Sequence, residues 1–243
     1  MQIMRRFFVP KLSIGADGAR FSPEEARHLV DVVRLREGDR VRIFDGEGAE
    51  FEGVVRQDGK RSVTVAELER VEPYASESPL RMTLAVALTK GDRFDLALQK
   101  AVELGVTTFV PLLTERCEVK LKDSQKKLER WNRMVIEASK QCGRAILMQI
   151  APTKTFDELI SSDLGDAEVL LFTERSGQKL DSSKRFDEIL VLIGPEGGWA
   201  DSELELAKSN GVNLVTLNGR ILRAETASIA VAAIVQNLFG DLN

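Results

Sequence analysis

Apolar strands and amphipathic helices alternate along the sequence from Leu80 onward, and this alternation constrains the fold more than any other feature. Short apolar runs predict strands at residues 82–88, 106–113, 169–173, 189–193 and 213–217. Amphipathic periodicity predicts helices at residues 92–104, 124–142, 201–210 and 224–239. Because parallel strands need crossover connections, this order predicts an α/β domain with a mostly parallel sheet covered by helices.

The first 72 residues follow a different pattern. Short strands are expected at residues 5–9 and 40–45, and period-two alternation predicts two longer ones at 49–56 and 61–71. The sequence Ser22-Pro23-Glu24-Glu25 is a capping box that begins a helix. A few short strands closing on one helix predict a small β-barrel. The polar, proline-bounded stretch 72–79 is the expected linker, so the predicted domains are 1–72 and 80–243.

Charge and composition narrow the possible partners. The net charge of −4 argues against a purely electrostatic nucleic-acid binder. Residues 114–147 nevertheless carry 9 basic and 5 acidic side chains, which suits either a local phosphate contact or a solvated helix face. With two cysteines and one histidine, no metal site is expected. No apolar run approaches the roughly 18 residues of a membrane span, so the prediction is a cytoplasmic protein with no membrane contact.

The most informative local feature is the apolar strand that ends in a loop with three glycines, residues 189–198. A phosphate-binding loop would continue with Lys and Ser or Thr, but Trp199 and Ala200 follow, and Glu196 would repel phosphate. A carboxylate and free backbone amides suit a ligand with hydroxyls, a base edge or positive charge, and S-adenosylmethionine offers all three. The alternative interpretation is a tight strand-to-helix turn.

A second strand ends in an Asn218-Gly219 turn and leads into the last helix. Arg220 and Arg223 lie close to the start of that helix, where the helix dipole disfavours cations, so they are better suited to an anion than to stability. Residues 227–235 are almost all small or apolar. Such a helix is expected to be buried on all sides, within the domain or against a second subunit.

Ile193–Gly198 followed by Arg220–Ala227 closely resembles the RsmE family, the small-subunit ribosomal RNA methyltransferases of the SPOUT superfamily. The resemblance covers essentially all 243 residues. It implies an N-terminal PUA-like RNA-binding barrel and a C-terminal SPOUT domain with a deep trefoil knot, an exception to the usual absence of knots. The further matches are His28 with Val33-Arg34, Gln99-Lys100 with Glu103–Val106, Glu115-Arg116-Cys117 with Lys120, and Gln141–Arg144.

The resemblance also implies a function. The expected enzyme is a homodimer without a metal that uses S-adenosylmethionine to methylate N3 of a uridine near the decoding region of 16S ribosomal RNA, within an assembled 30S subunit. The implied donor-binding residues are Phe172, Thr173, Gly194, Pro195, Glu196, Gly197, Leu217, Asn218, Gly219, Ile221 and Leu222. The basic residues expected to contact RNA are Arg5, Arg6, Arg34, Arg116, Lys120 and Arg144.

Arg223 is the predicted catalytic residue, because the uracil nitrogen must lose its proton before it attacks and the resulting anion needs a nearby cation. No general base is evident, since His28 lies far away in the sequence. Two other classes of protein stay open at this point. One is a non-catalytic RNA-binding protein with a degenerate methyltransferase domain, and the other is a nucleotide-using α/β enzyme such as a kinase. Donor binding and magnesium-ATP binding would distinguish them.

The sequence departs from the usual family pattern at two positions. Ala200 stands where the family usually has Ser or Thr, so the helix cap is expected to move to Asp201 or Ser202, with Ser202 and Glu205 forming a capping box. Asn218 stands where the family usually has Gly. Asn tolerates a left-handed backbone better than most residues, so the loop is expected to keep its shape.

Overall fold

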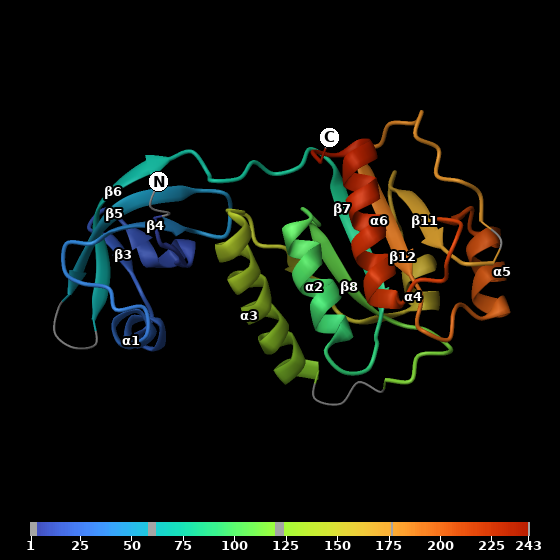
Figure 1. The fold of residues 1–243 in the computed structure, drawn as a ribbon, viewed down its shortest axis with the longest axis horizontal. Helices are drawn as coiled ribbons and strands as arrows, with labels where there is room; N and C mark the ends of the chain where they lie inside the picture. Colours follow the sequence, from blue (N-terminus) through green and yellow to red (C-terminus); the bar gives the residue numbers. More distant parts are fainter. Residues whose placement is uncertain (1–3, 58–61, 120–123, 176, 243) are drawn as a thin grey trace. The chain divides into compact units, whose positions relative to one another are not determined.

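The structure, a computed structural model, describes residues 4–57, 62–119, 124–175 and 177–242. The chain forms two compact units (Figure 1). The first contains residues 1–77 together with 139–147, and the second contains residues 78–138 and 148–243. The predicted domains, 1–72 and 80–243, differ from these units in the segment 139–147, which the prediction places in the C-terminal domain.

The first unit is a curled six-stranded sheet with one helix, α1 (Pro23–Asp31). Its strands lie in the order β1-β4-β5-β6-β3-β2, with β1 and β4 parallel and the other neighbours antiparallel. The Ser22 hydroxyl accepts a hydrogen bond from the Glu25 amide at 3.2 Å, which confirms the predicted start of α1. The strands are β1 (Arg6–Phe8), β2 (Ile14–Gly15), β3 (Gly18–Arg20), β4 (Arg40–Phe44), β5 (Glu50–Gln57) and β6 (Val63–Val71).

Buried ion pairs hold the segment 139–147 in the first unit. Arg6 contacts the fully buried carboxylate of Glu50 at 3.0 Å and donates to the carbonyl oxygens of Ser139 and Arg144, both at 2.8 Å. The Arg144 guanidinium in turn contacts Glu77 at 2.7 Å. These contacts explain why residues distant in sequence join one unit.

The second unit has a parallel sheet with the strand order β10-β8-β7-β12-β11-β13, and β9 pairs with β8. Every pairing in this sheet is parallel, as the alternation of strands and helices predicts. Its strands are β7 (Arg81–Ala87), β8 (Thr108–Leu113), β9 (Gln149–Ile150), β10 (Lys154–Thr155), β11 (Glu168–Phe172), β12 (Glu188–Ile193) and β13 (Asn213–Val215).

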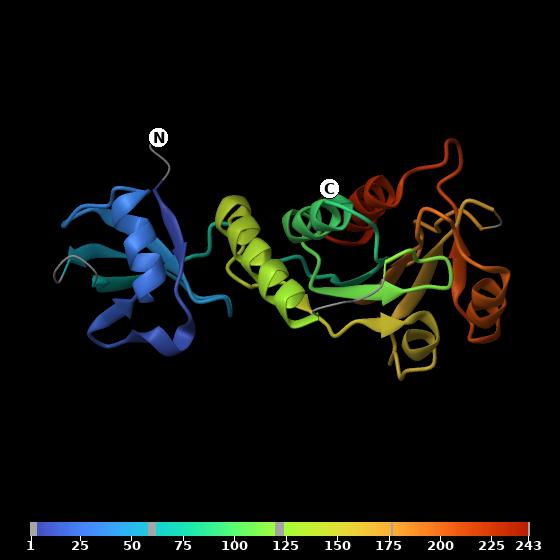
Figure 2. The same cartoon turned by 90° about the horizontal axis from the view of Figure 1, so that it is seen from below.

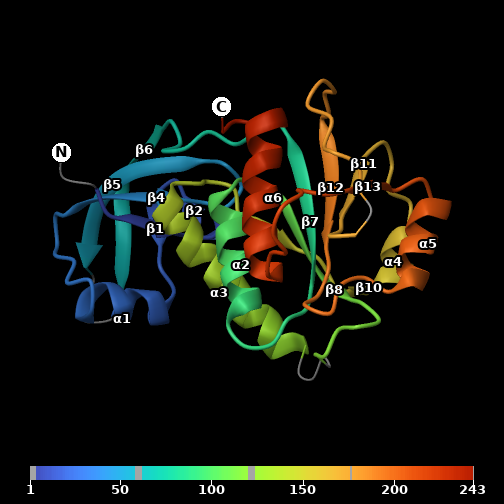
Figure 3. The ribbon, with the colours of Figure 1, turned by 45° about the vertical axis from the view of Figure 1, so that its right-hand side comes forward.

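Helices cover both faces of this sheet. Figures 2 and 3 show α2 and α6 together on one face and α4 and α5 on the other. The predicted helices 124–142 and 224–239 are found with the same bounds, as α3 and α6. The helices are α2 (Arg93–Glu103), α3 (Ser124–Cys142), α4 (Phe156–Ile160), α5 (Asp201–Ser209) and α6 (Ala224–Phe239).

Helix α6 is not buried on all sides within the chain. Its inward face is buried on the sheet and α2, whereas Ile229, Ala230, Ala233 and Ile234 stay partly exposed. Burial within the domain is therefore ruled out as the full explanation of its apolar sequence. Within the described part of the chain, no helix is long and apolar enough to span a membrane.

Candidate functional site

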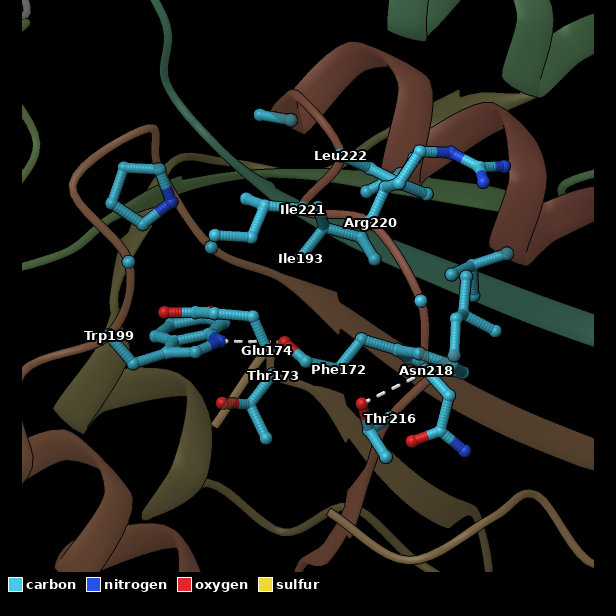
Figure 4. Close-up of a pocket in the computed structure, with 18 residues that line it drawn as sticks. Phe172, Thr173, Glu174, Ile193, Trp199, Thr216, Asn218, Arg220, Ile221 and Leu222 are labelled. Atoms are coloured by element: carbon cyan, nitrogen blue, oxygen red, sulfur yellow. Dashed lines mark hydrogen bonds between the residues drawn. The ribbon is translucent and has the colours of Figure 1, made fainter. Parts of the chain in front are cut away.

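A pocket of about 320 Å³ lies where β11, β12 and β13 end (Figure 4). The loops that follow these three strands and the first turns of α6 line it, so the glycine loop and the Asn218-Gly219 turn meet at one place. Ligands of open α/β sheets bind at this end of the strands. The predicted donor-binding residues that line the pocket are Phe172, Thr173, Gly194, Pro195, Leu217, Asn218, Gly219, Ile221 and Leu222.

Trp199 fixes the inner side of the glycine loop. Its indole is only 2% exposed and donates a hydrogen bond to the Phe172 carbonyl at 2.8 Å (Figure 4). A Cβ at Gly194 would lie 3.0 Å from the indole ring, so glycine lets the strand end pass close to Trp199. Gly198 has a φ of +68°, and a Cβ there would lie 2.9 Å from the Glu174 carboxylate.

Two predicted donor-binding residues do not line the pocket. The Glu196 carboxylate pairs with Arg93 at 2.8 Å, and the Gly197 carbonyl accepts a hydrogen bond from Arg116 at 3.0 Å. Both contacts are made to neighbouring segments of the second unit. Neither residue lines the pocket in this structure, and the contact of Glu196 and Gly197 with the donor stays a prediction.

The start of α5 also differs from the prediction. Ala200 is the residue that precedes the helix, and no Ser202–Glu205 capping box forms. The buried Glu203 carboxylate accepts from the Ala200 amide at 2.9 Å, which is the half of a capping box that needs no side-chain acceptor at Ala200. Ser202 instead donates to the Glu115 carboxylate at 2.8 Å.

The loop after β13 keeps the expected backbone shape. Asn218 has a φ of +53° and Gly219 a φ of +92°. The Asn218 amide donates to the Thr216 hydroxyl at 3.4 Å. Asn218 thus replaces glycine in a left-handed conformation, as predicted. Ile221 projects from this loop with 84% of its surface exposed.

The two arginines of the last loop differ in position. Arg220 lines the pocket, whereas Arg223 is the exposed residue just before α6 and does not line it. Neither guanidinium makes an ion pair or hydrogen bond with any residue that the structure describes. Both cations are therefore available to an anion near the mouth of the pocket.

Sequence reasoning missed several lining residues, of which Glu174 is the most informative. It directly follows Thr173 at the end of β11 and brings a carboxylate to the pocket, 3.5 Å from the Arg175 guanidinium. Its place after an apolar strand was the available signal. The other missed residues include Ile193, Trp199, Thr216, Ala224, Ala227 and Val231.

The predicted RNA-contacting residues separate into distinct groups. Arg5 and Arg34 are exposed on the first unit, with Arg5 donating to the Val33 carbonyl at 2.7 Å. Arg6 and Arg144, by contrast, have side chains that are only 7% and 5% exposed. Their guanidinium groups are engaged within the unit, which favours a structural role, and their phosphate contacts stay a prediction.

The two remaining candidates lie between β8 and α3. Arg116 contacts the glycine loop, as described above. Lys120 lies outside the described residues. Nearby, the hydrogen bond between Lys90 and Glu118 raises the pKa of the lysine and lowers the pKa of the carboxyl. In the described part of the chain, no three His, Cys, Asp or Glu side chains gather where they could hold a metal ion.

A parallel α/β unit with this pocket, joined to a curled β-unit, is an architecture of RNA methyltransferases. Residues 76–236 match the family model described as an RNA methyltransferase domain. Residues 21–68 match the model described as an RNA methyltransferase PUA domain. The class of protein is thus defined for both units.

Individual relatives narrow the class to a family. The chain is 39% identical to a ribosomal RNA small subunit methyltransferase E of Synechocystis, over 86% of this chain and 70% of that protein. It is 31% identical to the enzyme of the same name from Bacillus subtilis, over 95% and 96% of the two chains. The chain belongs to the ribosomal RNA small subunit methyltransferase E family.

A solved structure extends the likeness to the fold. The Neisseria gonorrhoeae ribosomal RNA small subunit methyltransferase E, bound to S-adenosyl methionine, superposes with a TM-score of 0.88. That protein is 32% identical in sequence, and the match covers 99% of this chain and 100% of that one.

Proposed function

We propose that this protein is an S-adenosylmethionine-dependent methyltransferase that methylates N3 of a uridine in 16S ribosomal RNA, near the decoding region. The observation that carries the proposal is the pocket at the ends of β11, β12 and β13. The pocket is intact in this protein. Its Neisseria relative, which has the same fold, was solved with bound S-adenosyl methionine. An intact pocket of this kind also argues against a non-catalytic RNA-binding protein.

The residues present fit this methyl donor. Ile193, Trp199 and Leu217 offer apolar surface for a purine ring, and the Glu174 carboxylate offers a partner for positive charge. Glycine is needed at positions 194 and 198, because a side chain there would clash with Trp199 or Glu174 in the pocket wall. We expect the three loops that build the pocket to be tied in the trefoil knot of the superfamily.

When bound, the donor supplies a methyl group already activated by its cationic sulfur. The work of the chain is therefore mainly positioning. Arg223 is proposed to stabilise the uracil anion that forms when N3 loses its proton, because a guanidinium keeps its charge and offers five donors. Arg220, at the pocket itself, is placed to contact an adjacent phosphate. The target uridine must leave its stack to reach the donor.

The first unit is proposed to bind the ribosomal RNA, and Arg5 and Arg34 are its candidate phosphate contacts. The proposed substrate is the assembled 30S subunit, and the proposed compartment is therefore the cytoplasm. We further propose that the enzyme works as a homodimer without a metal. The partly exposed apolar face of α6 supports a second copy as the cover of this helix.

The function can be tested with 30S subunits purified from a strain that lacks this protein. Incubation with the enzyme and methyl-labelled donor should label 16S ribosomal RNA, and mapping should find the label on N3 of one uridine. Labelling at another atom would overturn the N3 assignment. Binding of ribosomal RNA without donor binding would instead support the non-catalytic alternative, and binding of magnesium-ATP would support a nucleotide-using enzyme.

A further inference from the structure

The motif Glu115-Arg116-Cys117 follows β8 after Thr114 and has no part in the function proposed above. Its three residues contact three different segments of the second unit. The Cys117 thiol donates to the Leu88 carbonyl, just after β7, at 3.0 Å. The motif is therefore anchored to the sheet next to the end of β7.

Glu115 joins the motif to the first turn of α5. Its amide donates to one carboxylate oxygen of Glu203 at 2.9 Å, and the other oxygen of Glu203 accepts from the Ala200 amide at 2.9 Å. Glu203 is only 5% exposed, so its carboxylate is a buried bridge between two backbone segments. Ser202 adds a hydrogen bond to the Glu115 carboxylate at 2.8 Å.

Arg116 reaches the glycine loop itself. Its guanidinium donates to the Gly197 carbonyl at 3.0 Å. A Cβ at Gly197 would lie 3.2 Å from the Arg116 Cβ, so the two segments also pack closely. Gly194 and Gly198, on either side of this contact, line the pocket.

A loop with three glycines has more backbone freedom than a loop of the same length with fewer glycines. Within this loop, Trp199 is fixed through Phe172 and Ala200 through Glu203. At Gly197, the contact with Arg116 fixes the peptide carbonyl in the same way. A ligand that needs this backbone in one conformation binds more tightly when the loop is already held there.

We propose that Arg116 is a positioning residue of the methyl-donor site, which holds the glycine loop in its binding conformation. This inference rests on the proposed function, because it takes the pocket ligand to be S-adenosylmethionine. It replaces the RNA contact that the basic character of the segment predicts for Arg116. The two roles can be distinguished with a variant of Arg116: loss of the positioning role weakens donor binding, whereas loss of an RNA contact weakens binding of the 30S subunit.

The test is Arg116→Ala, measured by calorimetric titration with S-adenosylmethionine and by steady-state methylation of 30S subunits. The dissociation constant and the KM for the donor should rise about tenfold, equal to about 1.4 kcal/mol. The KM for 30S subunits, and kcat at saturating donor, should stay within about twofold of wild type. Arg116→Lys keeps the charge and should recover part of the donor affinity.

Arg81→Ala is the matched control, because Arg81 also makes an exposed contact, with Glu188 at 2.8 Å, but at the start of β7. Its donor affinity should equal that of wild type.

A raised KM for 30S subunits with unchanged donor affinity in Arg116→Ala would overturn the inference and restore the RNA contact. If Arg116→Ala does not fold, Arg116→Lys decides: wild-type donor affinity would oppose the inference and weakened affinity would support it. Failure of the wild-type protein to bind the donor would overturn the proposed function itself.

Discussion

At the scale of single residues, the proposed chemistry depends most on Arg223. It is exposed at the start of α6, beside a pocket that it does not line, and no described side chain neutralises it. Arg223→Ala should lower the single-turnover rate on 30S subunits about 10²–10³-fold at saturating donor, and Arg223→Lys should recover part of the loss. Arg220→Ala is the comparison variant. A large loss there with a near-normal rate for Arg223→Ala would transfer the role to Arg220.

Two neighbouring arginines, Arg5 just before β1 and Arg6 at its start, should behave in opposite ways. Arg6→Ala leaves the buried Glu50 carboxylate without its closest partner and should cost about 3 kcal/mol of unfolding free energy. Arg5→Ala should change stability by no more than about 0.5 kcal/mol, since Arg5 is exposed. It should instead weaken RNA binding and reduce the salt dependence by about one unit of slope. Urea unfolding and RNA titration at several salt concentrations measure both effects. Normal stability of Arg6→Ala would contradict its structural role.

At the level of elements, the edge strand β13 depends on a glycine that is distant in sequence. A Cβ at Gly177 would lie 2.3 Å from the Val215 carbonyl carbon, where the chain from Gln178 bridges to β13. Gly177→Ala should therefore displace the end of β13, destabilise the protein by about 1–3 kcal/mol and weaken donor binding. Gly15→Ala is the control, because a Cβ at Gly15 meets no atom within 4 Å. Equal melting temperatures for the two variants would contradict this account.

The elements that could be predicted are those with a long apolar period. Helices α3 and α6 have the predicted bounds, because periodicity over many turns specifies both ends. The strands β2, β9 and β10 have two residues each, too few to show any period, and α4 has five. These short elements form because neighbouring strands and helices stabilise them. Such tertiary contacts cannot be deduced from the sequence pattern.

The location of the candidate site could also be predicted from apolar strands. Its loops follow apolar strands, so the carboxyl ends of β11, β12 and β13 could be expected to meet. The partners of side chains within a loop could not be predicted: Glu196 pairs with Arg93, which is 103 residues away in sequence. The ion pair of Arg6 with Glu50 could not be predicted either, because the two residues are distant in sequence.

For the whole molecule, the apolar character of α6 leads to a prediction about assembly. The face of α6 that points away from the sheet carries Ala230 and Ala233, flanked by Ile229 and Ile234, all partly exposed. Small residues on such a face allow a second helix to approach closely, and the apolar flanks favour burial. Light scattering at micromolar concentration should therefore report about twice the chain mass of 27.0 kDa.

Ala233→Glu places a charge in the centre of that face and should give a folded monomer of about one chain mass. Methylation should be much reduced, because Ala227 and Val231 of the same helix line the pocket. Ala16→Glu makes the same substitution at an exposed position of the first unit and should stay dimeric and active. Circular dichroism would establish that both variants fold. A wild-type protein that stays monomeric would refute the dimer, and a monomeric, fully active Ala233→Glu would show that one chain completes its own site.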